Sequence, residues 1–171
     1  MLSDDLFVRL INHRISNTLS RKEDFLSEAF AWMLINDSAL SVALLRENGP
    51  IFKDRSSNLT QIDSLDIKTQ QALGNYGRVD LTLGNPQEGM LLIESKVDAP
   101  YDQEQIDRYL SWAQQNRAVV LAIIPQQQLN RLTTISSNTQ FVGIRSWEEI
   151  GNFIEQLPNP SPPSTIFESL L

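Results

Sequence analysis

The sequence predicts an α/β fold with a mixed central sheet flanked by helices. Three observations carry this prediction. Residues 119–124 form an apolar run typical of a buried central strand, alternating strand-like runs at 78–83 and 91–97 precede it, and amphipathic helical patterns surround them. At 171 residues and 41% hydrophobic composition, the chain is long enough for one domain with a sizeable core.

The N-terminal third is predicted to be helical first and extended later. A pattern that begins at Leu6 indicates a first helix, and Ser20 with Glu23 forms a capping box that opens a second. Residues 49–60 indicate a loop, and residues 60–68 a strand that does not keep strict alternation. One broad face of the second helix is apolar: Phe25, Leu26, Ala29, Phe30, Met33 and Leu34.

Two strands are predicted next, separated by the turn-forming segment GNPQEG and paired as an antiparallel hairpin. In the first, Val79, Leu81 and Leu83 share one face, so Asp80 points to the other. In the second, Leu91, Ile93 and Val97 point one way, whereas Leu92, Glu94 and Lys96 point the other way.

The C-terminal half predicts a helix at about 102–116 and then the central strand at 119–124. A strand–helix–strand connection of this kind makes the flanking strands parallel. Residues 126–138 are polar with one short helix, residues 140–144 indicate a last strand, and Ser146 with Glu149 opens a last helix. We expect one domain over residues 1–157, with its core at about 20–125, and a proline-rich tail or linker over 158–171.

Composition excludes several classes of site. The chain has no cysteine, so disulfides and thiolate zinc sites are ruled out. It starts acidic rather than basic, and no apolar run approaches the roughly 18 residues that span a bilayer, so we expect a cytoplasmic protein without membrane contact. The net charge of −7 opposes tight DNA binding, unless the lysines and arginines of the N-terminal half gather on one face.

The order αβββαβ, with Asp80 on the second strand and Glu94-x-Lys96 on the third, resembles the PD-(D/E)xK or restriction-endonuclease-like superfamily. The resemblance covers roughly residues 20–125, and Val79 stands in place of the motif's proline. It implies that Asp80 and Glu94 bind Mg²⁺ or Mn²⁺ and that Lys96 helps to position and activate the attacking water. It also implies a third metal ligand, Glu28, and site roles for Gln105 and Tyr109.

Physical chemistry supports the same site. Mg²⁺ prefers oxygen ligands and retains several waters, so two or three carboxylates and a phosphate would suit it. Asp80 and Glu94 could share one ion if their strands pair in the right register, because neighbouring strands lie about 4.8 Å apart. Lys96 would approach a metal-bound water from the same face; its own pKa is lowered by a cation and raised by the carboxylates.

Each candidate also has a structural alternative. Asp80 and Glu94 could lie on a solvated sheet face, paired with Arg78 or Lys96, and Glu28 could belong to a solvated helix face. Tyr109 could be a core residue with Gln105 beside it. For the remaining polar candidates, Asp98 is expected beyond the pocket, Arg78 could meet a phosphate or a carboxylate, and His13 is expected to be peripheral.

We therefore predict a Mg²⁺-dependent deoxyribonuclease, of the endonuclease type, with DNA as its substrate. The sequence leaves open a catalytically silent nuclease-fold module that binds nucleic acid or protein, and a regulatory domain of a larger assembly. It also leaves the oligomeric state open, with a homodimer among the states that the resemblance suggests.

Overall fold

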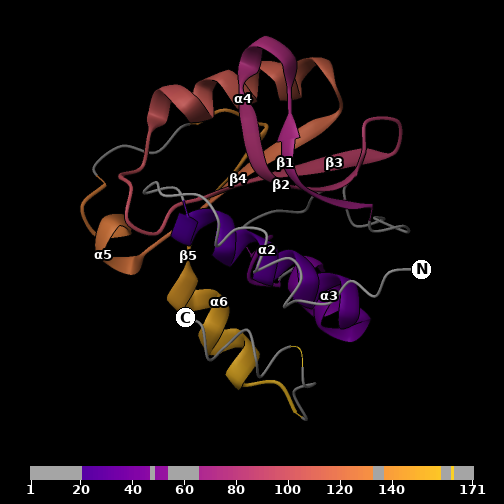
Figure 1. Cartoon of the computed structure of the whole chain (residues 1–171), viewed down its shortest axis with the longest axis vertical. Helices are drawn as coiled ribbons and strands as arrows, with labels where there is room; N and C mark the ends of the chain where they lie inside the picture. The colour runs from indigo at the N-terminus through magenta and orange to yellow at the C-terminus, as the bar shows by residue number, and fades with distance from the viewer. Residues whose placement is uncertain (1–20, 47–48, 54–65, 133–136, 159–162, 164–171) are drawn as a thin grey trace.

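The computed structural model describes residues 21–46, 49–53, 66–132, 137–158 and 163. In this part of the chain, one five-stranded sheet carries helices on both faces, so the predicted α/β fold with a mixed, helix-flanked sheet is confirmed (Figure 1). The elements in chain order are α2 (Arg21–Asn36), α3 (Ser38–Leu45), β1 (Ile67–Ala72), the 3₁₀ turn η1 (Gly74–Tyr76), β2 (Arg78–Asn85), β3 (Gly89–Ser95), α4 (Gln103–Gln115), β4 (Ala118–Ile124), α5 (Gln126–Leu129), β5 (Phe141–Ser146) and α6 (Trp147–Glu155).

The strands lie in the sheet in chain order, β1-β2-β3-β4-β5. The pairs β1–β2 and β2–β3 are antiparallel, whereas β3–β4 and β4–β5 are parallel. Both the predicted hairpin and the predicted parallel crossover through α4 are therefore confirmed. The start of β2 lies beside the end of β3, and the polar residues of interest lie there.

Two apolar layers hold the sheet between its helices. On one face, Leu81, Ile93 and Leu121 pack in a cluster with apolar residues of α2, α3 and α6. On the other face, Leu92 and Val120 pack with the buried side of α4 (Figure 1). Both faces of β3 and β4 are covered, so the hydrophobic effect favours apolar residues on both sides, and these two strands are apolar almost throughout.

Some boundaries differ from the predicted ones. The first strand runs over Ile67–Ala72 rather than 60–68, and of the predicted range only residues 66–68 are described. This edge strand is half exposed and mostly polar, so it gives no clear alternation. The helix α3 was not predicted, because its sequence SALSVALL is apolar on all sides and has no helical period.

Several predicted features lie outside the described residues. They are the first helix from Leu6, His13, Ser20 of the capping box, and most of the tail over 158–171. The Ser146 N-cap of the second predicted capping box is confirmed, because its side chain accepts a hydrogen bond from the Glu149 backbone N–H at 3.0 Å, while the Glu149 carboxylate pairs with Lys53. The predicted helix at 102–116 is also confirmed, with Asp102 as its N-cap.

A buried arginine ties β5 to the segment after α3. The guanidinium of Arg145 donates from Nε to the Pro50 carbonyl at 2.7 Å and from Nη2 to the Ile51 carbonyl at 3.0 Å. Arg145 is 4% exposed, so these bonds form away from water. Charged donors make the stronger protein hydrogen bonds, and this clamp fixes a segment that has little regular structure of its own.

The described helices were compared with the length and composition that a membrane span requires. No single one of them is long and apolar enough to cross a bilayer. Lys22–Asn36 and Ser38–Leu45 pass that test only as a pair, and the two are bent by 109° relative to each other.

Candidate metal centre

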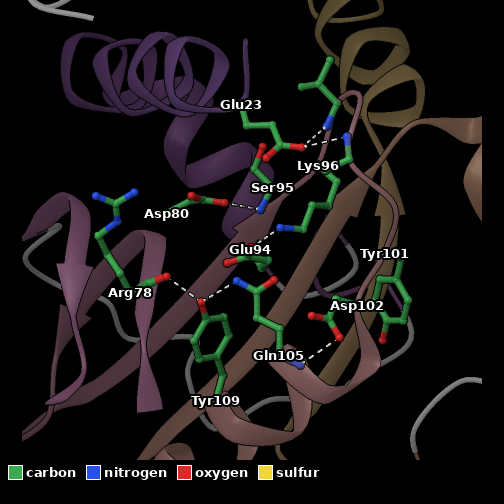
Figure 2. A network of polar contacts seen from close by, with 12 residues as sticks. Glu23, Arg78, Asp80, Glu94, Ser95, Lys96, Tyr101, Asp102, Gln105 and Tyr109 are labelled. Carbon is green, nitrogen blue, oxygen red and sulfur yellow. Dashed lines mark hydrogen bonds and ion pairs between the residues drawn. The ribbon is translucent and has the colours of Figure 1, made fainter. Parts of the chain in front are cut away.

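Asp80 lies where the hydrogen-bonded ladder between β2 and β3 ends. The pairing stops at Leu81 and Ile93, and beyond it the Asp80 carboxylate accepts the Ser95 backbone N–H through Oδ2 at 2.8 Å (Figure 2). The Asp80 side chain thus bridges from β2 to the end of β3. This contact fixes one carboxylate oxygen, while the other, Oδ1, accepts a longer bond of 3.4 Å from Gln70 Nε2.

Glu94 and Lys96 lie together at the end of β3. Lys96 Nζ donates to Glu94 Oε1 at 2.7 Å, and both side chains are largely buried, with 4% of Glu94 and 12% of Lys96 exposed. The predicted shared face of these two residues is therefore confirmed. The second carboxylate oxygen, Glu94 Oε2, is buried and has no hydrogen-bond partner among the residues described. A buried carboxylate oxygen without a partner is costly and calls for a ligand.

Burial raises the pKa of both acids, Asp80 and Glu94. Removal from water raises the pKa of Asp80 from 3.8 to about 6, against the lowering effects of the Ser95 N–H and Lys96. Burial also raises the pKa of Glu94 from 4.5 to about 7, and the negative charge of Asp80 raises it further. Both carboxylates would be stabilised by an added positive charge.

At Lys96, burial and the neighbouring charges shift the pKa in opposite directions. Burial alone would lower the pKa of Lys96, but the charge and hydrogen bond of Glu94, helped by Glu23 and Asp80, outweigh burial and raise it. The sequence did not decide whether the pKa of Lys96 is lowered by a cation or raised by the carboxylates. In the protein without a cation, the carboxylates raise it. Without a bound cation, Lys96 is therefore protonated at neutral pH.

Gln105 and Tyr109 come from one face of α4, as predicted, and lie below this pair (Figure 2). Gln105 Nε2 donates to the Tyr109 hydroxyl at 2.8 Å, and that hydroxyl donates to the Arg78 carbonyl at 2.5 Å. Tyr109 is also 1% exposed and packs in the core. Burial, and then the charge of Glu94, raise the pKa of Tyr109, so the phenol remains neutral beside the carboxylate.

The predicted third ligand, Glu28, lies on α2. Glu28 is 6% exposed, but no three His, Cys, Asp or Glu side chains in the described residues are grouped to hold one ion. The α2 residue whose charge acts on both Asp80 and Lys96 is Glu23. Glu23 Oε1 accepts the backbone N–H groups of Val97 at 3.1 Å and Ala99 at 3.2 Å (Figure 2). A metal-binding role for Glu28 stays a prediction.

The backbone of Lys96 is held from two further elements. Its N–H donates to the Ile123 carbonyl of β4 at 2.9 Å, and its carbonyl accepts Trp147 Nε1 of α6 at 3.1 Å. Sequence reasoning missed Trp147, Glu23 and Gln70 as neighbours of the site. The pattern offered a signal for Glu23 alone, which was assigned to a helix cap instead.

The other polar candidates lie on the surface. Asp98 forms an ion pair with Lys22 at 2.8 Å, and its side chain is 49% exposed. Arg78 contributes its backbone carbonyl to Tyr109, whereas its side chain is exposed. Exposed ion pairs contribute little stability, so the Asp98 pair is a weak tie between α2 and the loop after β3.

The family model of the PD-(D/E)XK nuclease superfamily matches residues 10–136. The chain belongs to this superfamily. No curated protein and no solved structure gave a significant match. Membership suggests nuclease activity, and the matched residues include all elements from α2 to β4.

Proposed function

We propose that this chain is a divalent-metal-dependent endonuclease that hydrolyses DNA phosphodiester bonds at the site formed by Asp80, Glu94 and Lys96. The observation that carries the proposal is the buried Glu94 carboxylate, which has one oxygen bonded to Lys96 and one without a partner in the described residues. A hydrophilic group of this kind, buried beside a second acid, is typical of a site whose ligand is a cation.

The donors fit Mg²⁺ or Mn²⁺. Magnesium is usually bound by one or two carboxylates, with waters and substrate phosphates filling the remaining positions, and Asp80 with Glu94 supplies that number. When bound, such an ion polarises the phosphate and lowers the pKa of a coordinated water. Glu28, as predicted from the resemblance, is a third candidate, and Glu23, whose charge acts on Asp80, is an alternative.

The side chains around the cation would have different roles. Lys96, held protonated beside Glu94, would donate a hydrogen bond to the attacking water or to a non-bridging phosphate oxygen and oppose its developing charge. Gln105 and Tyr109 would hold α4 in place beside the site, because the Tyr109 hydroxyl accepts from Gln105 and donates to the Arg78 carbonyl at the start of β2. The hydrogen bonds that join the Lys96 backbone to Ile123 and Trp147 would fix the position from which the Lys96 side chain extends.

The charge balance shapes how substrate would be recognised. With a net charge of −7, non-specific attraction to the DNA backbone is weak, so the bound cation itself would supply part of the phosphate affinity. We therefore expect DNA binding that depends on the divalent ion and falls less steeply with salt than for a basic nuclease. Binding without any divalent ion is expected to be weak.

The test is cleavage of supercoiled, linear and single-stranded DNA with Mg²⁺ or Mn²⁺, using wild type, Asp80→Ala and Asp98→Ala. Asp98 is a matched control, because it is an aspartate of the same region that pairs with Lys22 on the surface. We expect cleavage by the wild type and Asp98→Ala and none by Asp80→Ala. Equal cleavage by all three would point to a contaminant, and no cleavage by folded wild-type protein would favour a binding module.

A further inference from the structure

One residue of the edge strand β1 has a backbone conformation that its side chain does not favour. Gln70 has φ of 53°, in the left-handed region that is easy for glycine and uncommon for glutamine. Only one other non-glycine residue in the described chain has a positive φ, Arg117, which lies at the end of the turn directly before β4. Such strain persists where the surroundings fix it, and it gathers at functional sites.

The sheet register puts Gln70 opposite Asp80. Thr69 pairs with Leu81 and Gln71 pairs with Val79, so the residue between them on β1 faces the residue between them on β2. The pairing between β1 and β2 is interrupted at Gln70 and Asp80 and continues on both sides of them. The left-handed turn of the backbone therefore occurs directly across from the candidate metal ligand.

The side chain of Gln70 is aimed at that ligand. Its Nε2 donates to Asp80 Oδ1 at 3.4 Å, while its Oε1 is buried and has no hydrogen-bond partner among the described residues. Asp80 is thus held from two sides, since the Ser95 N–H occupies Oδ2 at 2.8 Å. A buried amide oxygen beside the Asp80 carboxylate cannot be satisfied by it when that carboxylate is ionised, because an ionised carboxylate only accepts hydrogen bonds.

We propose that Gln70 is a positioning residue of the site, whose amide orients the Asp80 carboxylate and whose Oε1 accepts a hydrogen bond from the hydration shell of the bound cation. Only the second part of this proposal, the hydrogen bond to the hydration shell of the cation, rests on the proposed function. Groups that hold a metal-ligating side chain typically change metal affinity by about 10–100-fold when they are removed. The strained backbone is then the means by which an edge strand delivers a side chain into the site.

The variant Gln70→Gly separates this role from a purely structural one. Glycine adopts the positive φ without strain, so the fold should be retained or become more stable, while the amide is lost. Arg117→Gly is the matched control, because it relieves the same kind of strain at a residue whose side chain donates to the Gln87 carbonyl instead. Asp80→Ala gives the full effect of losing the carboxylate.

Two readouts are needed. The first is amide hydrogen exchange of Ser95 without metal, which reports directly on the Asp80 Oδ2 contact. The second is Mn²⁺ affinity by calorimetry. We expect Gln70→Gly to exchange the Ser95 amide at least about tenfold faster and to bind Mn²⁺ about tenfold more weakly. We expect Arg117→Gly to match the wild type in both.

Two results would overturn the proposal. Ser95 exchange in Gln70→Gly within about twofold of wild type would show that the amide does not hold Asp80, and an unchanged Mn²⁺ affinity would remove the link to the cation. If the wild type binds no Mn²⁺ at all, the proposed function fails instead. Ser95 exchange then decides the orienting role of Gln70 by itself, since that readout involves no metal.

Discussion

The ionisation of Glu94 predicts how the stability of the metal-free protein depends on pH. Its pKa is raised from 4.5 to about 7, chiefly by burial. For an acid whose pKa is raised by folding, the stability it contributes is fully present below pH 4.5 and is lost as the pH rises through about 7. Replacing Glu94 with glutamine should abolish this pH-dependent loss, because the amide does not ionise.

The size of the effect follows from the same values. Each tenfold change in an ionisation equilibrium corresponds to about 1.4 kcal/mol, so a rise from 4.5 to about 7 amounts to about 3 kcal/mol. Most of this change falls between pH 5 and pH 8. We therefore expect Glu94→Gln to gain about 2–3 kcal/mol relative to wild type between these two pH values.

Urea unfolding in EDTA at pH 5, 6, 7 and 8 measures this difference, because acids that titrate alike in both proteins cancel in the comparison. Glu155→Gln, at an exposed position in α6, controls for the loss of one negative charge. Added Mn²⁺ at pH 8 should stabilise the wild type and have little effect on Glu94→Gln. A free-energy difference between wild type and Glu94→Gln that stays constant from pH 5 to pH 8 would refute the reasoning.

Three further substitutions test other parts of the account. Lys96→Ala should reduce DNA cleavage by at least about 100-fold in single-turnover assays while calorimetry still detects Mn²⁺ binding; loss of both together would contradict its assigned role. Tyr109→Phe should lower the free energy of unfolding by about 1–2 kcal/mol in urea titrations, because the Arg78 carbonyl loses its buried donor. Arg145→Met should cost about 2–4 kcal/mol in the same assay, since three backbone carbonyls lose a charged donor; a change below about 0.5 kcal/mol would mean that water replaces it.

The sequence was most informative where the local pattern and the sheet agree. The alternation around Glu94 gave the correct face for Glu94 and Lys96, because β3 is regular and Leu91, Ile93 and Val97 pack on the opposite side. The apolar run of β4 likewise indicated a strand covered on both faces. Neither inference required knowledge of contacts between distant residues.

The alternation around Asp80 was less reliable. Val79 was predicted to share a face with Leu81, yet it packs in the cluster under α4, whereas Leu81 packs on the other side of the sheet. The irregularity coincides with the end of the β2–β3 pairing and with the positive φ of Gln70. A period-two pattern carries no information about such a break.

Long-range partners could not be predicted for a related reason. Glu23 is separated by 74 residues from the Val97 N–H that it accepts, and Trp147 by 51 residues from the Lys96 carbonyl to which it donates. These bonds depend on how α2 and α6 lie against the end of β3. The polar strand β1 was displaced in the prediction for the same reason, because pairing at the sheet edge places it rather than an apolar period.

The central claim is that Asp80 and Glu94 hold one divalent cation. Crystals of the wild-type protein soaked in Mn²⁺, with anomalous diffraction data, test it most directly, and crystals of Asp80→Ala treated in the same way are the control. The account predicts an anomalous peak within about 2.5 Å of carboxylate oxygens of both residues, absent from the variant. Anomalous peaks elsewhere with none between these two carboxylates, or the same peak in Asp80→Ala, would contradict it.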